Sequence, residues 1–300
     1  MTDTTDQFDT EEKHLNEDST GSDRAELPEM ELLDIDGVEL MVHDSGSGDP
    51  VVFVHGGGGD ECFAVLQEPA LTEHYRLIHY HRRGWGESAS IGLPLSIEEQ
   101  AADCRAVMQH LGISQAHLSG LSYGGTILLQ FVVDFPDAVH SLALMEPGLP
   151  EVTDDSPEFH EWETKAGPLF EKGETAAGLE AFFQGICGQE FVAAFDQTLP
   201  AGWFERWVDD SDTLFQYDVP ALDAWEFTEE DAARITAPVL NMKGADTAPP
   251  FKEIHETVQS WIPHAESVVL PDATHCMLEI NPAGSAEALA EFFSQHPMEG

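Results

Sequence analysis

The stretch His117-Leu118-Ser119-Gly120-Leu121-Ser122-Tyr123-Gly124-Gly125 decides the fold, because in it a strand pattern passes directly into a helix pattern. Residues 116–119 have the character of a buried strand, and residues 126–134 are mostly apolar, as in a buried helix. A Gly-x-Ser-x-Gly motif alone is a weak signal, but this strand–turn–helix context is the one in which a nucleophilic serine stands at a sharp turn. We therefore predict that Ser122 Oγ is exposed at the edge of a sheet.

Strand and helix patterns alternate on both sides of this motif. Asp36-Gly37 between two apolar runs predicts a β-hairpin, and Ser96-Ile97-Glu98-Glu99 predicts a capping box that opens a helix. Further apolar strand patterns cover residues 51–54, 76–80, 141–145, 239–242 and 267–270, and helices are expected over residues 97–111, 252–261 and 286–293. Such an alternation predicts an α/β protein whose mostly parallel sheet has helices on both faces.

The chain divides into three kinds of segment. Residues 1–28 are acidic and almost devoid of apolar side chains, so we expect a disordered tail there. Residues 149–235 lack buried-strand patterns and are rich in helical and aromatic ones, so we expect a helical cap over the sheet. The α/β core is then expected over residues 29–148 and 236–300.

An acyl-transfer serine needs backbone N–H groups that stabilise a developing oxyanion. One donor is expected to be the N–H of Tyr123, at the start of the helix after Ser122. The second is expected in the loop 55–59, His-Gly-Gly-Gly-Gly, which follows the strand pattern of residues 51–54. We assign it to Gly57, with Gly58 as the alternative. A phosphate-binding interpretation of this loop is not favoured, because no Gly-Lys-Ser/Thr follows it.

A base and an orienting acid are expected in the chain order Ser, Asp or Glu, His. His275 follows the strand pattern of residues 267–270, at the end of a strand where ligands meet such sheets. Asp246 follows the strand 239–242 and is predicted to be the acid, while Glu146, just after the strand 141–145, is the alternative. Asp272 is too close in sequence to His275. No metal site is expected at His79 and His81, since no third ligand stands near them.

Together these motifs resemble those of the α/β-hydrolase superfamily over most of residues 30–300. The matching features are the His55-Gly56-Gly57 loop, the Arg83-Gly84-Trp85-Gly86-Glu87-Ser88 turn, the Ser122 motif, Asp246 and His275. The resemblance implies an eight-stranded, mostly parallel sheet with a helical cap, a Ser122–His275–Asp246 triad and no cofactor. In one departure from the family pattern, His81 stands where relatives usually have Asp, which puts the local packing in question.

The activity implied by the resemblance is that of a serine hydrolase that forms an acyl-enzyme. Epoxide hydrolases and haloalkane dehalogenases look similar but use Asp as the nucleophile. The expected substrate is an uncharged carboxylic ester of small to medium size, as for a carboxylesterase. Aromatic side chains of the cap are candidates for an acyl pocket, although most of them are expected to form the cap's own core: Phe182, Phe183, Trp203, Phe204 and Trp207. The alternatives are a C–C bond hydrolase, a lactonase, an aminopeptidase, or a non-catalytic small-molecule-binding protein of this fold.

The charge of the chain limits its partners. There are 57 acidic and 12 basic side chains, which gives a formal net charge of −45. Such a chain repels nucleic-acid phosphates and anionic membrane surfaces, so neither is expected as a partner. Self-repulsion destabilises the compact state in dilute buffer, whereas screening over about 3 Å at 1 M salt removes most of that penalty. The composition resembles that of proteins from halophilic archaea, which work in molar salt.

We expect a cytoplasmic protein whose cysteines are free. Residues 1–26 show neither an apolar signal region nor a twin-arginine pair, and no apolar run approaches eighteen residues. Cys62, Cys104, Cys187 and Cys276 lie far apart and form no Cys-x-x-Cys pair, so buried thiols are expected.

Overall fold

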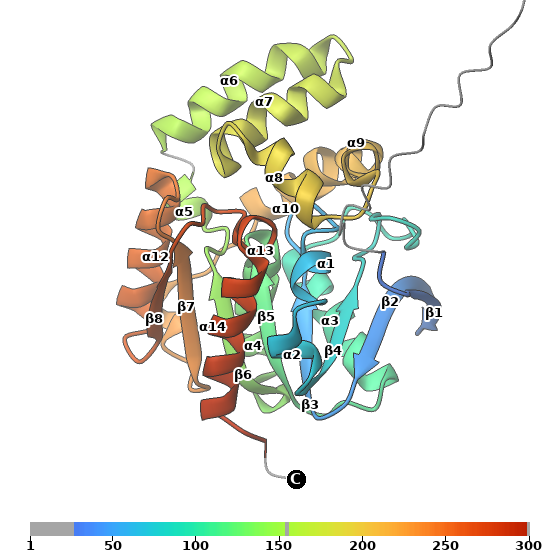
Figure 1. Ribbon diagram of the computed structural model, residues 1–300, viewed down its shortest axis with the longest axis vertical. Helices are drawn as coiled ribbons and strands as arrows, with labels where there is room; N and C mark the ends of the chain where they lie inside the picture. Colours follow the sequence, from blue (N-terminus) through green and yellow to red (C-terminus); the bar gives the residue numbers. More distant parts are fainter. Residues whose placement is uncertain (1–26, 154–155, 299–300) are drawn as a thin grey trace, which may run out of the picture.

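A mixed sheet of eight strands forms the centre of the molecule (Figure 1). The computed structural model describes residues 27–153 and 156–298. The strand order is β1-β2-β4-β3-β5-β6-β7-β8, in which β1–β2 and β2–β4 are antiparallel and the other pairs parallel. The bounds are β1 Glu31–Ile35, β2 Val38–Gly46, β3 Asp49–Val54, β4 Tyr75–Tyr80, β5 Ala116–Leu121, β6 Val139–Met145, β7 Val239–Gly244 and β8 Glu266–Leu270. The predicted eight-stranded, mostly parallel sheet is confirmed.

The first two strands form the predicted hairpin. Asp36 and Gly37 have φ values of 54° and 87°, which a two-residue turn of this kind requires. The Gly37 N–H also donates to Asp34 Oδ1 at 2.8 Å. The acidic tail predicted for residues 1–28 lies, apart from residues 27 and 28, outside the described residues.

Helices cover both faces of the sheet, because successive strand residues point to opposite sides. Val51 and Phe53 of β3 pack in one apolar cluster, with side chains of α1, α2 and α14. Val52 and Val54 pack in the other, with side chains of α3, α4 and α12. The bounds of the core helices are α1 Cys62–Val65, α2 Pro69–Thr72, α3 Ile97–His110, α4 Tyr123–Asp134, η1 Pro136–Ala138, α12 Pro249–Trp261, α13 Met277–Ile280 and α14 Pro282–Gln295.

Helix α3 begins at the predicted capping box. The Glu99 N–H donates to Ser96 Oγ at 3.2 Å, and the Ser96 N–H donates to Glu99 Oε2 at 2.8 Å. Two N–H groups at the start of the helix are thereby satisfied.

A helical segment connects β6 to β7 and lies across one end of the sheet (Figure 1). Its elements are α5 Pro150–Thr153, α6 Pro157–Glu171, α7 Thr175–Cys187, α8 Phe191–Thr198, α9 Trp203–Thr213, η2 Leu214–Asp218, α10 Val219–Asp223 and α11 Glu229–Ala232. We call residues 149–235 the cap. Polar contacts tie it to the core: Arg206–Asp60, Asp210 to the Gly86 N–H, Thr213 to Gly84 O, and Arg82–Asp218.

The expectation that all four cysteines are free is wrong for two of them. Cys187, the last residue of α7, forms a disulfide with Cys276, with the two Cα atoms 5.3 Å apart, while Cys62 and Cys104 are free and buried. The sequence separation of 89 between the two partners hid this pairing from sequence reasoning. The bond joins the cap to the loop after β8. Among the described residues, no helix is long and apolar enough to cross a membrane.

Candidate active site

Ser122 stands at a strained turn between β5 and α4. Its φ of 53° and ψ of −124° place a non-glycine residue in a region that is rarely populated and that concentrates at functional sites. The neighbouring glycines are required by close packing. A Cβ on Gly120 would lie 2.7 Å from the Gly124 backbone, and a Cβ on Gly124 would overlap the carbonyl oxygen of Val54. The chain can therefore turn sharply at Ser122 because Gly120 and Gly124, two residues to either side, have no side chains.

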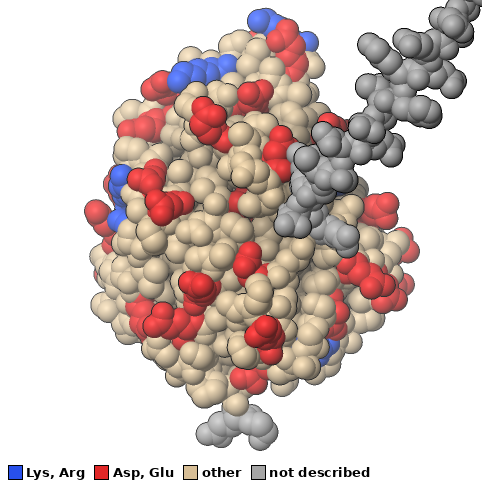
Figure 2. All heavy atoms as spheres, in the orientation of Figure 1, with Lys and Arg blue, Asp and Glu red and all other residues tan. Residues whose placement is uncertain are grey.

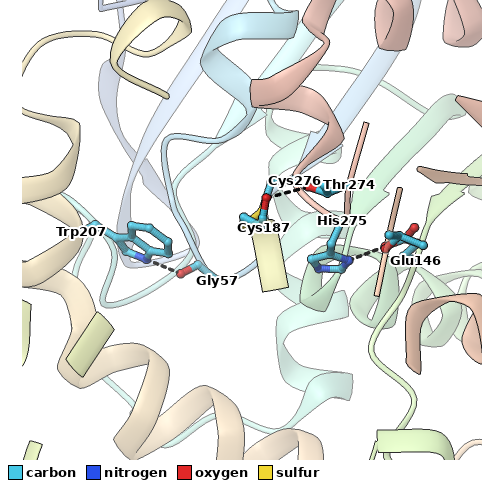
Figure 3. Close-up of a disulfide and its surroundings, with 8 residues drawn as sticks. Gly57, Glu146, Cys187, Trp207, Thr274, His275 and Cys276 are labelled. Carbon is cyan, nitrogen blue, oxygen red and sulfur yellow. Dashed lines mark hydrogen bonds and ion pairs between the residues drawn. A yellow bond between two sulfur atoms is a disulfide. The ribbon is translucent and has the colours of Figure 1, made fainter. Parts of the chain in front are cut away.

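His275 lies in the loop after β8 and is buried between two partners. Its Nδ1 is 2.6 Å from Glu146 Oε2 (Figure 3). The ring of Phe251, from α12, stacks on its imidazole with centroids 3.8 Å apart. A carboxylate at Nδ1 leaves Nε2 as the nitrogen that can accept a proton.

The structure corrects the prediction that Asp246 orients the imidazole, because the acid at His275 is Glu146. Glu146 follows β6 directly, is fully buried and has a φ of 46°. It also accepts hydrogen bonds from the Gly244 N–H and from Thr247 Oγ1, both at 3.0 Å. Asp246 is exposed, and its backbone N–H donates to Ala273 O at 2.9 Å. The end of β7 thus supplies donors to the acid rather than the acid itself.

The glycine loop after β3 faces the same site. Gly57 and Gly58 both line a cavity with Ser122 and His275, and Tyr123 begins helix α4, as the assignment of the two oxyanion donors requires. The Gly57 carbonyl accepts a hydrogen bond from Trp207 Nε1 of the cap at 2.7 Å (Figure 3). The choice of Gly57 over Gly58 stays a prediction.

Two cavities share Gly57, Ser122, Phe183 and His275 in their walls. The larger, of about 130 Å³, is mostly apolar, with cap and core side chains that include Phe159, Phe182, Ile186, Leu214, Phe215 and Phe251. The smaller, of about 40 Å³, is lined partly by aromatic side chains and partly by Asp60, Glu61 and Glu279. Phe182 and Phe183 therefore do face the site. Trp203 and Trp207 line the smaller cavity, and both are almost fully buried.

Histidines packed beneath the glycine loop are held neutral by burial. Burial, and secondarily the charge of Arg82, lowers the pKa of His55 well below its usual range. Burial likewise lowers the pKa of His79, and it lowers that of His81 to about 4. At the departure from the family pattern, the His81 ring packs against those of His55, Phe63 and His79, with centroids 5.6 to 5.9 Å apart, and its Nε2 lies 3.7 Å from Asp60 Oδ1, beyond hydrogen-bond distance.

Two buried carboxyl groups lie beside this loop. Glu61 Oε1 accepts the Gly56 N–H, and burial raises the pKa of Glu61 to about 7. Burial, and then the nearby Glu61, raises the pKa of Glu279 well above its usual range. Within the described part of the chain, no group of three or more His, Cys, Asp or Glu side chains is placed to bind a metal ion.

Sequence reasoning missed three side chains that hydrogen-bond the backbone of this loop, namely Glu61, Arg82 and Trp207. Glu61 stands two residues after the quoted loop 55–59 and Arg82 directly before the quoted turn 83–88, whereas Trp207 reaches the loop from the cap. For Glu146 the available signal was its place directly after a strand, the same signal that favoured Asp246.

Comparisons with known proteins agree with this architecture. A profile of the alpha/beta hydrolase fold matches residues 49–282. A non-heme haloperoxidase from Rhodococcus erythropolis is 27% identical over 258 residues, which cover 82% of this chain and 92% of that protein. An esterase from Thermogutta terrifontis superposes with a TM-score of 0.71 at 22% identity, over 90% of this chain and 100% of that one. An N-acyl homoserine lactone degrading enzyme gives 0.68 at 23% identity, over 87% and 100%.

The chain belongs to the α/β-hydrolase fold family, as the resemblance implied. Esterases and other hydrolases are among its structural neighbours.

Proposed function

We propose that the protein is a serine hydrolase that cleaves uncharged carboxylic esters of small to medium size through an acyl-enzyme. The observation that carries the proposal is the convergence of three elements at one cavity. A strained Ser122 and a His275 held by Glu146 line that cavity together with the glycine loop.

The reaction follows from these positions. His275 Nε2 takes the proton of Ser122 Oγ as the oxygen attacks the ester carbonyl, and Glu146 holds the imidazole and stabilises its cation. The N–H groups of Tyr123 and Gly57 stabilise the oxyanion. The proton passes from His275 to the departing alcohol. Water, deprotonated by the same histidine, then attacks the acyl-serine. As the acyl C–O bond breaks and the acid leaves, His275 returns that proton to Ser122 Oγ.

The cavities support the choice of substrate. The larger one is apolar and of limited volume, which suits a short to medium acyl chain. The smaller one is lined by Asp60, Glu61 and Glu279 and by no Lys or Arg side chain of the described residues, so its lining offers no fixed positive charge to an anionic substituent.

A panel of nitrophenyl esters of increasing acyl length, assayed in molar KCl, tests the proposal. Turnover is expected to fall once the acyl chain exceeds the cavity. Ser122→Ala is expected to abolish turnover, while Ser119→Ala, a buried serine of β5, is the matched control and keeps it. Near-wild-type hydrolysis by Ser122→Ala contradicts the mechanism. Absence of ester turnover, with cleavage of a lactone, an aminoacyl amide or a diketone instead, contradicts the substrate.

High salt is proposed as the working condition, because the sequence has 57 acidic and 12 basic side chains. On the face that Figure 2 shows, acidic side chains are scattered with few basic ones among them. Ester turnover at 0.1 M KCl is therefore expected to be below that in 2 M KCl.

A further inference from the structure

A buried ion pair links the cap to the glycine loop, and the catalytic mechanism above makes no use of it. Arg82 follows β4, and Asp218 ends η2 of the cap. The Arg82 Nη2–Asp218 Oδ2 distance is 2.8 Å, the Nη1–Oδ1 distance is 3.1 Å, and both residues are almost fully buried. Replacing such a pair by apolar side chains is often neutral or stabilising. A contribution to stability therefore does not account for the presence of this ion pair.

The arginine also bonds the peptide that carries the proposed oxyanion donor. Arg82 Nη2 donates to Gly56 O at 2.8 Å, and His55 Nδ1 lies 3.0 Å from the same oxygen. In a trans peptide the carbonyl and the following N–H point in opposite directions. Anchoring Gly56 O on the protein side therefore fixes the direction of the Gly57 N–H.

The same guanidinium contacts the second donor residue. The Arg82 Cζ lies 4.6 Å from the ring centroid of Tyr123. Gln100 bridges the two residues: its Oε1 accepts from Arg82 Nη1 at 2.6 Å and its Nε2 donates to the Tyr123 hydroxyl at 2.7 Å. Arg82 is thus connected to both residues that would stabilise the oxyanion.

We propose that Arg82 is the positioning residue of the oxyanion hole and that Asp218 fixes it from the cap, so that the hole is aligned only when the cap is seated. This inference rests on the proposed function. A charged donor at Gly56 O also polarises the peptide, which makes the Gly57 N–H a stronger donor.

Asp218 is built to hold the guanidinium in one orientation. Its Oδ2 accepts from Trp85 Nε1 at 3.1 Å as well as from Arg82. Burial by itself lowers the pKa of Arg82, but the Asp218 carboxylate outweighs burial and the pKa is raised. The forked guanidinium reaches Asp218, Gln100 and Gly56 together, which the single ammonium of lysine does not.

The test is Arg82→Lys, which keeps the charge and removes the fork. The matched control is Arg83→Lys, whose guanidinium binds Asp103 Oδ1 at 2.5 Å. For each variant, kcat and KM are measured on a nitrophenyl ester. Affinity is measured for two probes with one carbon skeleton: a trifluoromethyl ketone, which Ser122 Oγ converts into a tetrahedral oxyanion, and its trifluoromethyl carbinol, which forms none.

In Arg82→Lys, kcat is expected to fall by about 10- to 100-fold, part of the effect of losing a whole oxyanion donor, while KM changes little. Ketone affinity falls by a similar factor, carbinol affinity stays, and Arg83→Lys resembles the wild type. If Arg82→Lys does not fold, Asp218→Asn, which removes one acceptor of the guanidinium, is expected to show the same split with a smaller factor.

An unchanged kcat in folded Arg82→Lys overturns the inference, as does an equal loss of ketone and carbinol affinity, which marks a purely structural role. Wild-type protein that neither turns over esters nor binds the ketone overturns the proposed function itself. The two failures are therefore distinguishable.

Discussion

Glu146 and Asp246 stand after neighbouring strands, β6 and β7, and their surroundings distinguish them. Glu146 is buried against His275 Nδ1 and receives two further hydrogen bonds, whereas Asp246 is exposed. In Glu146→Gln the amide no longer stabilises the imidazolium, and kcat is expected to fall by about 10²- to 10⁴-fold. Asp246→Asn is the matched control, and ester turnover by it should stay within about twofold of the wild type. A large loss in Asp246→Asn with a small one in Glu146→Gln would reverse the assignment.

The buried carboxyl group of Glu61 is expected to make the stability of the protein depend on pH. Its pKa is raised from 4.5 to about 7 in the folded state. Its contribution to the free energy of unfolding is therefore fully present below pH 4.5 and is lost as the pH rises through 7. Glu61→Gln keeps an acceptor for the Gly56 N–H and does not titrate. Between pH 4.5 and 7 the stability of the variant relative to the wild type is therefore expected to rise, by up to about 3 kcal/mol.

Urea unfolding at fixed molar KCl measures this difference in the free energy of unfolding. Glu73→Gln, which removes an exposed carboxylate, controls for the change in net charge. A difference between Glu61→Gln and wild type that does not grow with pH would show that Glu61 is ionised in the folded protein throughout this range.

Among single residues, those marked by a motif in their own stretch of sequence could be predicted. Ser122 and His275 each stand a few residues after a strand pattern, and the structure places them at one cavity. The acid could not be chosen in the same way, because two carboxylates follow adjacent strands and burial decides between them. Arg82 lies beside a motif, but its partner Asp218 is 136 residues away, and no short-range pattern reports such a contact.

Among the elements, the strands and the long helices were predictable because each has a pattern of its own. The capping box at Ser96 marked the start of α3, and the turn at Asp36-Gly37 marked the hairpin of β1 and β2. Helix α12 begins at Pro249, three residues before the predicted start, since proline is well suited to the first turn of a helix. The link between α7 and the loop after β8 had no such pattern.

That link, the Cys187–Cys276 disulfide, is expected to stabilise the seated cap. In the loop-entropy account, closure over 89 residues is worth at most about 4 to 5 kcal/mol. Reduction should therefore lower the Tm of the wild type, and it should leave the Tm of Cys187→Ser unchanged. Alkylation of the denatured, unreduced protein is expected to label Cys62 and Cys104 alone. Labelling of all four cysteines would contradict the pairing.

Across the whole molecule, the acids outnumber the bases so far that most carboxylates have no cationic side chain to pair with. One consequence is visible in the register of the first hairpin, where Asp34 lies directly opposite Glu39 and both are exposed. Like charges at facing positions destabilise a strand pair, by roughly 0.2 to 1 kcal/mol. The screening length is about 10 Å at 0.1 M salt, which leaves much of this repulsion in place. At 1 M salt it is about 3 Å, and most of the repulsion is removed.

The free energy of unfolding of the wild type, measured in urea, is therefore expected to rise from 0.1 M to 2 M KCl. Glu39→Lys should be more stable than the wild type in 0.1 M KCl and lose most of that advantage in 2 M. Glu31→Lys makes the same charge change in the same hairpin, but it faces Val42 instead of an acid. At low salt, the stability that Glu39→Lys gains beyond that gained by Glu31→Lys measures the repulsion between Asp34 and Glu39. The gain in stability common to both variants measures the effect of the net charge of the whole molecule. A wild type that gains nothing from KCl would contradict adaptation to salt, whatever the two variants do.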